Sequence, residues 1–186
     1  MVSARRPPGS VPARRSWGWH QLEPAWADHL VELADLDAGS TVLDVGAGHG
    51  VITEALLRRG LRVIAIELHP ERVRALRARF GDQATIVRAD AADLRLPRRP
   101  FHVVANPPFA HTSALLRRLL SSGSRLQSSH LIVPKAVAQR WSGRKAPGAA
   151  RWQRQWQTAT GPAIPRRAFR PRPRVDTMVL SFTPRR

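Results

Sequence analysis

The four residues Asn106-Pro107-Pro108-Phe109 are suited to holding a flat base that carries an exocyclic amino group. They follow an apolar run over 101–105 that predicts a buried strand. The Asn106 side-chain oxygen and the Pro107 carbonyl can accept hydrogen bonds from an amino group, and the Phe109 ring offers a stacking surface. The prolines fix φ and remove competing backbone donors. Taken alone, the tetrapeptide is equally typical of a strand end and proline-rich turn with Phe109 in the core.

A glycine-rich junction lies about sixty residues upstream. A predicted strand over 41–45 leads into Gly46, Gly48 and Gly50, and a helical pattern follows. Glycines between a strand and a helix allow the backbone to approach a ligand closely. Their spacing departs from the dinucleotide-binding fingerprint, because the third glycine comes one residue early. The chain lacks the Gly-x-x-x-x-Gly-Lys-Ser/Thr loop of nucleotide triphosphatases, which argues against that class.

Two acidic residues follow the next two predicted strands. Glu67 ends the run over 61–66 and is placed to accept hydrogen bonds from ribose hydroxyls. Asp90 follows the run over 84–88 and is placed to bind the amino group of an adenine. With the glycine junction, these acids predict a nucleoside pocket along the carboxyl edge of a parallel sheet. The alternative is that both are solvated acids at helix starts, where the helix dipole favours them.

Apolar periodicity alternates between strand and helix along most of the chain. A parallel, doubly wound α/β sheet is the architecture that such alternation predicts. The last run, over 175–182, is expected to close the sheet as an antiparallel hairpin strand. The elements expected are helices over 24–36, 50–59, 70–80, 112–121 and 134–141, and parallel strands over 41–45, 62–67, 84–88, 101–106 and 129–133.

Composition restricts the partners and the setting. The 186 residues carry 31 basic and 13 acidic side chains, a net charge of +18, which indicates a polyanion such as nucleic acid. Nearly all the cations are arginine, which suits phosphate contacts, although a GC-rich genome gives the same bias. The absence of cysteine excludes disulfides and fits a cytoplasmic setting. No apolar run approaches the roughly 20 residues of a membrane span, and no residue cluster has metal-ligand spacing.

The ends of the chain differ in composition from the middle. Residues 1–16 combine four arginines with prolines and are expected to form a disordered basic arm. Residues 17–186 are expected to form one domain, with no separate helical domain after it. Within it, the segment 142–162 mixes Trp152 and Trp156 with arginines. Such a pattern is typical of RNA contact, and it is equally typical of tryptophans packed in the core.

Together these motifs resemble a known group of enzymes. The stretch from Asp44 to Gly50, with Glu67, Asp90 and the Asn106-Pro-Pro-Phe motif, is similar to S-adenosylmethionine-dependent adenine-N6 methyltransferases. Residues 164–177 closely resemble the Pro-Arg-x-x-Phe-x-Pro-x-Pro-x-Val-x-Ser signature of ribosomal RNA adenine dimethylases. That family includes the erythromycin-resistance (Erm) enzymes and the small-subunit dimethyladenosine enzymes, and the resemblance runs from about residue 17 to 183.

The resemblance implies a Rossmann-like class I methyltransferase fold and a reaction. A methyl group would pass in line from the sulfonium of S-adenosylmethionine to N6 of adenine, without a strong general base. The target amine would be held by the Asn106 side chain and the Pro107 carbonyl, with the base stacked between aromatic rings. The implied catalytic residues are Asn106, Pro107, Phe109 and Phe169. The implied cofactor-binding residues are Gly46, Gly48, Gly50, Glu67, Asp90, Ala91, Asn106 and His20, the last within Gly18-Trp-His-Gln-Leu22, where the family has Ser/Gly-Gln-Asn/His-Phe.

Within the family, the short chain resembles the truncated actinobacterial Erm proteins. That likeness implies a monomeric, cytoplasmic enzyme acting on 23S ribosomal RNA and conferring macrolide-lincosamide-streptogramin resistance. A small-subunit ribosomal RNA dimethylase is the nearest alternative. A DNA adenine-N6 methyltransferase shares the Asn-Pro-Pro-Phe motif, including Pro107, but usually carries a separate target-recognition domain. A non-catalytic RNA-binding factor for ribosome assembly is the alternative from outside the enzymes.

Overall fold

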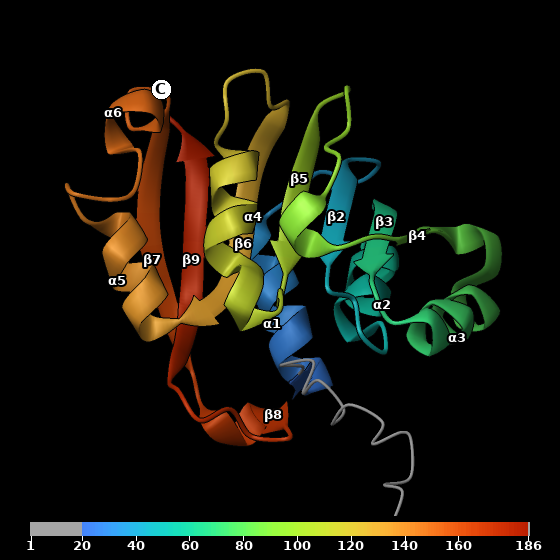
Figure 1. Cartoon of the computed structure of the whole chain (residues 1–186). Coiled ribbons are helices and arrows are strands. Elements are labelled where there is room, and N and C mark those ends of the chain that lie inside the picture. The colour runs from blue at the N-terminus through green and yellow to red at the C-terminus, as the bar shows by residue number, and fades with distance from the viewer. Residues whose placement is uncertain (1–19, 186) are drawn as a thin grey trace, which may run out of the picture.

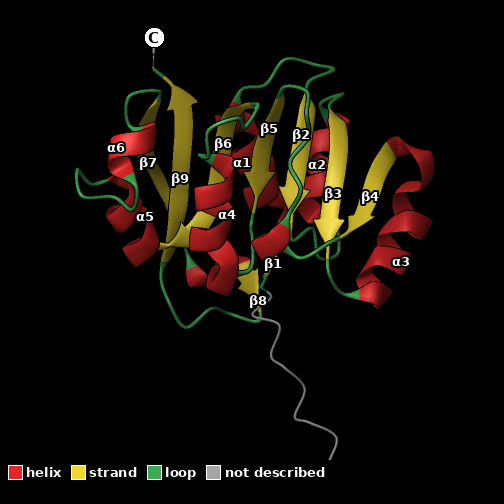
Figure 2. Ribbon diagram, turned by 45° about the horizontal axis from the view of Figure 1, so that its top comes forward, coloured by secondary structure: helices red, strands yellow, loops and turns green. Residues whose placement is uncertain are grey.

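A seven-stranded sheet forms the centre of the protein in the computed structural model, which describes residues 20–185 (Figures 1 and 2). The strand order is β4-β3-β2-β5-β6-β9-β7. The first five strands in this order are parallel, whereas β9 is antiparallel to both neighbours. The strands are β2 (Thr41–Val45), β3 (Arg62–Glu67), β4 (Ala84–Arg88), β5 (Phe101–Ala105), β6 (Leu126–Pro134), β7 (Trp156–Ile164) and β9 (Thr177–Pro184).

The predicted fold class is confirmed. The sheet is mostly parallel and β9 is the strand that reverses direction, close to the expected run over 175–182. The strand β7 was not predicted from the sequence, and it pairs with β9 at the edge of the sheet. The expected basic arm over residues 1–16 lies outside the described residues.

Helices cover both faces of the sheet (Figure 2). Successive residues of a strand point to opposite faces, so each strand contributes to two cores. On one face Val42 and Val63 pack with apolar residues of the first three helices, and on the other face Leu43 and Val103 pack with those of the fourth and fifth. The helices are α1 (Pro24–Ala34), α2 (Val51–Arg58), α3 (Pro70–Phe80), α4 (Thr112–Leu119), α5 (Lys135–Ser142) and the short α6 (Ala149–Trp152).

A two-stranded ribbon pairs the first described strand with the segment between β7 and β9. Strand β1 (Gln21–Leu22) pairs with β8 (Phe169–Arg170), so that Leu22 stands opposite Phe169. The ribbon brings the segment before α1 beside the segment between β7 and β9, although about 150 residues separate them in the sequence. Both strands are too short to leave a periodic signal in the sequence.

The tryptophans of the segment 142–162 are part of the core. The exposed fractions of Trp152 and Trp156 are only 4% and 8%. Trp152 stacks on Trp141 with ring centroids 6.2 Å apart and meets Phe182 edge-on at 5.4 Å. Of the two interpretations of this segment, core packing is therefore the one that the structure supports for these rings.

Candidate active site

Four predicted site residues meet at the carboxyl edge of the parallel strands. Gly46 follows β2, Glu67 ends β3, Asp90 follows β4 and Asn106 follows β5. In the sheet Val45 stands opposite Ile66, so that neighbouring strands end nearly level. A pocket opens there, and its lining includes His20, Gln21, Asp44, Gly46, Ala47 and Asn106. The four residues thus lie at the edge where the site was predicted, but Glu67 and Asp90 do not line this pocket, and their shared binding role stays a prediction.

The glycine loop adopts backbone conformations that favour glycine. The φ angles are +80° at Gly46, +60° at Gly48 and +83° at Gly50. A Cβ atom on Gly46 would lie 2.8 Å from Cδ of Pro108, so this glycine allows the loop to contact the Asn-Pro-Pro-Phe motif. A Cβ on Gly50 would lie 2.5 Å from a ring carbon of Phe80, so Gly50 packs the loop against α3. Cofactor binding by the three glycines stays a prediction.

Glu67 is engaged with backbone amides. Its Oε2 accepts a hydrogen bond from the Gly48 amide at 2.9 Å, and its Oε1 accepts from the Leu68 and His69 amides at 2.8 Å each. The side chain is buried, which excludes the interpretation of Glu67 as a solvated surface acid. Oε1 already accepts two hydrogen bonds, whereas Oε2 accepts one and can take another, so the predicted ribose contact through Oε2 is chemically compatible with this arrangement.

Asp90 caps a short helical turn. Its Oδ1 accepts a hydrogen bond from the Ala92 amide at 2.8 Å, at the start of the 3₁₀ segment Ala91–Asp93. Asp90 is half-buried and Ala91 is buried. Hydrogen bonding of Asp90 to an adenine amino group stays a prediction. The oxygen available for it is Oδ2, because Oδ1 already accepts from Ala92. Across the described residues, no cluster of three or more His, Asp or Glu side chains could hold a metal ion.

Asp44 is a buried carboxyl group in the pocket lining. Its Oδ2 accepts a hydrogen bond from the Thr53 hydroxyl at 2.7 Å, which ties the end of β2 to α2. Its Oδ1 is buried without a hydrogen-bond partner. Burial raises the pKa of Asp44 to about 7, and the charge of Glu67 acts in the same direction. Asp44 therefore organises the glycine loop and titrates near neutral pH.

Asn106 presents an unsatisfied acceptor in the pocket. Its Nδ2 donates to the His20 carbonyl at 2.9 Å, and this bond fixes the orientation of the amide because a carbonyl oxygen can only accept. The amide oxygen, Oδ1, therefore points away from His20, and it is buried without a hydrogen-bond partner. Buried acceptors are nearly always satisfied, so this oxygen is free to accept a hydrogen bond from water or from a ligand that enters the pocket. An exocyclic amino group can donate such a bond.

His20 links the Asn-Pro-Pro-Phe motif to the β8 segment. Its ring stacks on Phe109 with centroids 5.5 Å apart and planes at 30°. Its Nδ1 lies 2.7 Å from the Pro171 carbonyl oxygen, so Nδ1 carries the proton in this contact. His20 lines the pocket, and its cofactor role stays a prediction. The backbone contact with Asn106 was not foreseen from the sequence, because 86 positions separate the two residues.

Phe169 departs from the expected arrangement. Its side chain is 1% exposed and packs in the core cluster that includes Leu22 and Leu30. The ring therefore offers no open face to a base in this structure, whereas the half-buried Phe109 stacks on His20, a residue of the pocket lining. The stacking role of Phe169 stays a prediction, and it requires the β8 segment to move.

Comparison with known proteins assigns the family. A family model described as ribosomal RNA adenine dimethylase matches residues 13–186. The chain belongs to the ribosomal RNA adenine dimethylase family. Members of this family are S-adenosylmethionine-dependent rRNA adenine methyltransferases, and the enzyme class expected from the motifs is thereby confirmed.

Sequence relatives carry names of two kinds. A ribosomal RNA small subunit methyltransferase A from Synechococcus sp. is 34% identical over 190 residues, which cover 92% of this chain and 67% of the relative. Mycinamicin-resistance protein MyrB of Micromonospora griseorubida is 36% identical over 156 residues, which cover 81% of this chain and 49% of the relative. The chain thus spans about two thirds of the length of the small-subunit relative. The narrower expectation of an Erm-type enzyme is not decided by these likenesses.

Solved structures support the fold. The 23S rRNA methyltransferase ErmE has a TM-score of 0.78 at 22% identity, over 87% of this chain and 68% of that one. A dimethyladenosine transferase from Plasmodium falciparum also has a TM-score of 0.78 at 22% identity, over 89% of this chain and 64% of that one. The fold is the Rossmann-like methyltransferase fold that the motifs imply.

Proposed function

We propose that this protein transfers methyl groups from S-adenosylmethionine to N6 of an adenine in ribosomal RNA. The observation that carries the proposal is the buried Oδ1 of Asn106, which has no hydrogen-bond partner at the edge of the sheet. The contact between Gly46 and Pro108 places this acceptor beside the glycine loop expected to hold the cofactor. The family assignment favours RNA over DNA as the nucleic acid.

The chemistry required of the chain is positioning and hydrogen bonding. S-adenosylmethionine supplies an electrophilic methyl group on its sulfonium. The adenine amine is a poor nucleophile, because its lone pair is delocalised into the ring. A hydrogen bond from N6–H to Oδ1 of Asn106 localises that lone pair as the nitrogen becomes tetrahedral, and the Pro107 carbonyl is the second proposed acceptor. Both contacts strengthen as positive charge develops on N6, so they act in the transition state.

The same edge of the sheet offers residues for the cofactor. We assign the methionine and ribose ends to the loop of Gly46, Gly48 and Gly50 and to Glu67, and the adenine end to Asp90 and Ala91. His20 closes this part of the pocket from the β1 side. After transfer, the methylated nitrogen is cationic and acidic, so its proton can leave to water without a dedicated base.

We further propose that the substrate is 23S ribosomal RNA and that the modification confers macrolide-lincosamide-streptogramin resistance. The likeness to a mycinamicin-resistance protein supports this choice. Small-subunit ribosomal RNA is the second candidate, favoured by a relative of that name that matches 92% of the chain. The two candidates predict methylated adenines in different RNA molecules.

Primer extension on ribosomal RNA separates these candidates. RNA is taken from cells lacking the gene, from cells expressing it, and from cells expressing the Asn106→Ala variant. A stop at an adenine of 23S RNA that appears only with the active gene, together with a raised macrolide tolerance, is the expected result. A stop confined to 16S RNA assigns the enzyme to the small subunit. If neither RNA gains a modified adenine, the proposed function is wrong.

A further inference from the structure

Acidic and basic residues are divided unequally between two halves of the molecule. Residues 20–93 contain 12 acidic and 8 basic side chains, whereas residues 94–186 contain 19 basic side chains and a single acidic one, Asp176. The two halves take opposite sides of the sheet, although α1 packs behind β5 and β6 and β1 pairs with β8 (Figure 1). The first, the cofactor half, builds β2, β3, β4 and the first three helices, and the second, the target half, builds the strands from β5 onward. The excess positive charge therefore lies on the side of the expected base-binding motif.

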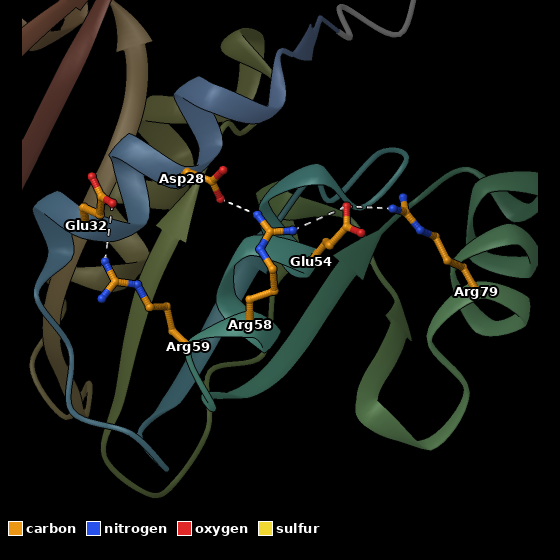
Figure 3. A network of polar contacts seen from close by, with 6 residues as sticks. All are labelled: Asp28, Glu32, Glu54, Arg58, Arg59 and Arg79. Atoms are coloured by element: carbon orange, nitrogen blue, oxygen red, sulfur yellow. Dashed lines mark hydrogen bonds and ion pairs between the residues drawn. The ribbon is translucent and has the colours of Figure 1, made fainter.

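Ion pairs neutralise much of the charge in the cofactor half (Figure 3). Arg58 contacts both Asp28 and Glu54, and Glu54 also contacts Arg79 at 2.7 Å. Arg59 lies 3.7 Å from Glu32. Several cations of this half thus have carboxylate partners within the protein. The target half lacks the acidic residues to do the same.

The densest group of cations in the target half lies in the segment 166–174, here named the arginine strap. All five of its arginines are exposed. Arg166 is paired with Asp176 at 2.8 Å, which uses the only acidic residue of this half. The other four have no carboxylate partner among residues 20–185, and they are Arg167, Arg170, Arg172 and Arg174.

The arginine strap is fixed beside the pocket. Arg170 stands opposite Gln21 in the β1–β8 ribbon, and Gln21 lines the pocket. The next residue, Pro171, accepts the hydrogen bond from the ring of His20, whose carbonyl in turn accepts from Asn106. Arg170 and Arg172 therefore flank Pro171, which is connected to Asn106 through His20 by two hydrogen bonds.

We propose that the arginine strap binds the backbone phosphates of RNA on either side of the adenine that enters the pocket. This proposal rests on the proposed function. A base drawn out of its stack stays attached to its own phosphates, which must then lie at the mouth of the pocket. Guanidinium groups bind phosphate oxygens in a two-pronged geometry, and such contacts position a nucleic acid without reading its sequence. The base pocket beside the strap favours RNA over an acidic protein as the partner.

The test compares two variants that remove the same charge. Binding of a short, fluorescently labelled single-stranded RNA of mixed sequence is measured over a range of salt concentrations. Each phosphate contact on a single strand contributes about 0.7 to the slope of log K against log salt. Arg170→Gln with Arg172→Gln should therefore flatten the slope by roughly 1.4. The control, Arg62→Gln with Arg74→Gln, removes two exposed arginines from the cofactor half and should leave the slope unchanged.

Three outcomes of the binding experiment overturn the proposal. They are an unchanged slope in the strap variant, equal flattening in both variants, and competition by polyglutamate as effective as competition by unlabelled RNA of equal charge. Should the first strap variant fail to fold by its thermal unfolding midpoint, Arg167→Gln with Arg174→Gln takes its place, with the same expected flattening.

Methyl transfer to purified ribosomal RNA is measured in parallel, because it separates this proposal from the proposed function. Strap-dependent RNA binding without any transfer by the wild-type protein would refute the function and leave the strap in place. Transfer with kinetics that the strap variants do not alter would refute the strap and leave the function in place.

Discussion

The cofactor half and the target half satisfy their polar groups in different ways. In the cofactor half Glu67 accepts three amide hydrogen bonds and Asp90 caps a turn, so both acids already have protein partners, although Asp44 keeps one buried oxygen unpaired. In the target half the Asn106 oxygen and four strap arginines have no such partners among the described residues. The first arrangement suits a preformed site for a compact ligand, since little has to be reorganised on binding. The second suits a partner that supplies the missing donors and anions itself.

The two halves meet where β2 and β5 end. Gly46 approaches Pro108 closely enough to exclude any side chain between them. Methyl transfer requires cofactor and base to be held within reach of each other, so a close contact between the two binding loops is expected of this reaction. A substitution in the cofactor half should therefore mainly change the binding of S-adenosylmethionine, and one in the target half should mainly change the binding or methylation of RNA.

Asn106→Ala should produce the largest effect, and only on the target side. Loss of one well-placed hydrogen-bonding group typically lowers kcat by about 10²–10³-fold, and the loss of both base positioning and lone-pair activation places this variant at the upper end. The measurement is the initial rate of transfer of labelled methyl groups to ribosomal RNA. Gln157→Ala removes an exposed amide from β7 of the same half and should keep the wild-type rate. A similar loss in both variants would contradict the role of Asn106.

Asp44 should make stability depend on pH. The native carboxyl holds its proton up to about pH 7, whereas in the unfolded chain it loses the proton near its ordinary pKa of 3.8. The native state therefore binds more protons in this window, and the free energy of unfolding falls as pH rises from 3.8 to about 7. Asp44→Asn removes this dependence. Relative to wild type, the variant should gain up to about 4 kcal/mol across the window.

Denaturant unfolding at several pH values measures that gain. Taking the difference between variant and wild type cancels other titrating groups, including His130, whose pKa is lowered to about 4 by burial. Asp82→Asn, at an exposed position, is the control and should show no such trend. A flat difference for Asp44→Asn would mean that the native carboxyl is already ionised at low pH.

Glu67→Ala should weaken S-adenosylmethionine binding on the cofactor side. The variant removes the proposed ribose acceptor, for a cost of about 1.5–3 kcal/mol in binding free energy. The three backbone amides lose their partner in the free and the bound protein alike, so that loss lowers folding stability instead. Isothermal calorimetry measures the change. Glu71→Ala removes an exposed acid from the first turn of α3 and should bind the cofactor like wild type. Unchanged affinity in Glu67→Ala would restrict Glu67 to bracing the loop.

Gly50→Ala tests the packing of the glycine loop with a smaller expected effect. Gly50 and Gly39 have similar φ angles, +83° and +78°, so alanine is strained at both positions. A Cβ at Gly39 has open space, whereas one at Gly50 would collide with Phe80. The free energy of unfolding should therefore fall further in Gly50→Ala than in Gly39→Ala, by about 1–3 kcal/mol. Equal losses in the two variants would show that the loop shifts freely.

Much of the fold was predictable because the buried parallel strands are apolar and the motifs mark where they end. The edge strand β7 was not, because Gly161 and Pro162 interrupt it and only its two end residues, Trp156 and Ile164, are buried. Proline is tolerated at the edge of a sheet, where its missing donor is not needed. For the site, residue types and strand ends indicated the edge and the candidate residues. Individual hydrogen-bond partners, such as His20 for Asn106, depend on tertiary contacts that no local pattern encodes.

Titration of S-adenosylmethionine into the Asn106→Ala protein tests the division between the two halves most directly. The Asn106 side chain is assigned here to the target base, and the groups assigned to the cofactor lie at the ends of β2, β3 and β4, with His20 on the β1 side. Calorimetry should therefore give a dissociation constant within a few-fold of the wild-type value, in a protein that no longer transfers methyl groups to ribosomal RNA. A loss of cofactor affinity as large as the loss of rate would contradict the account.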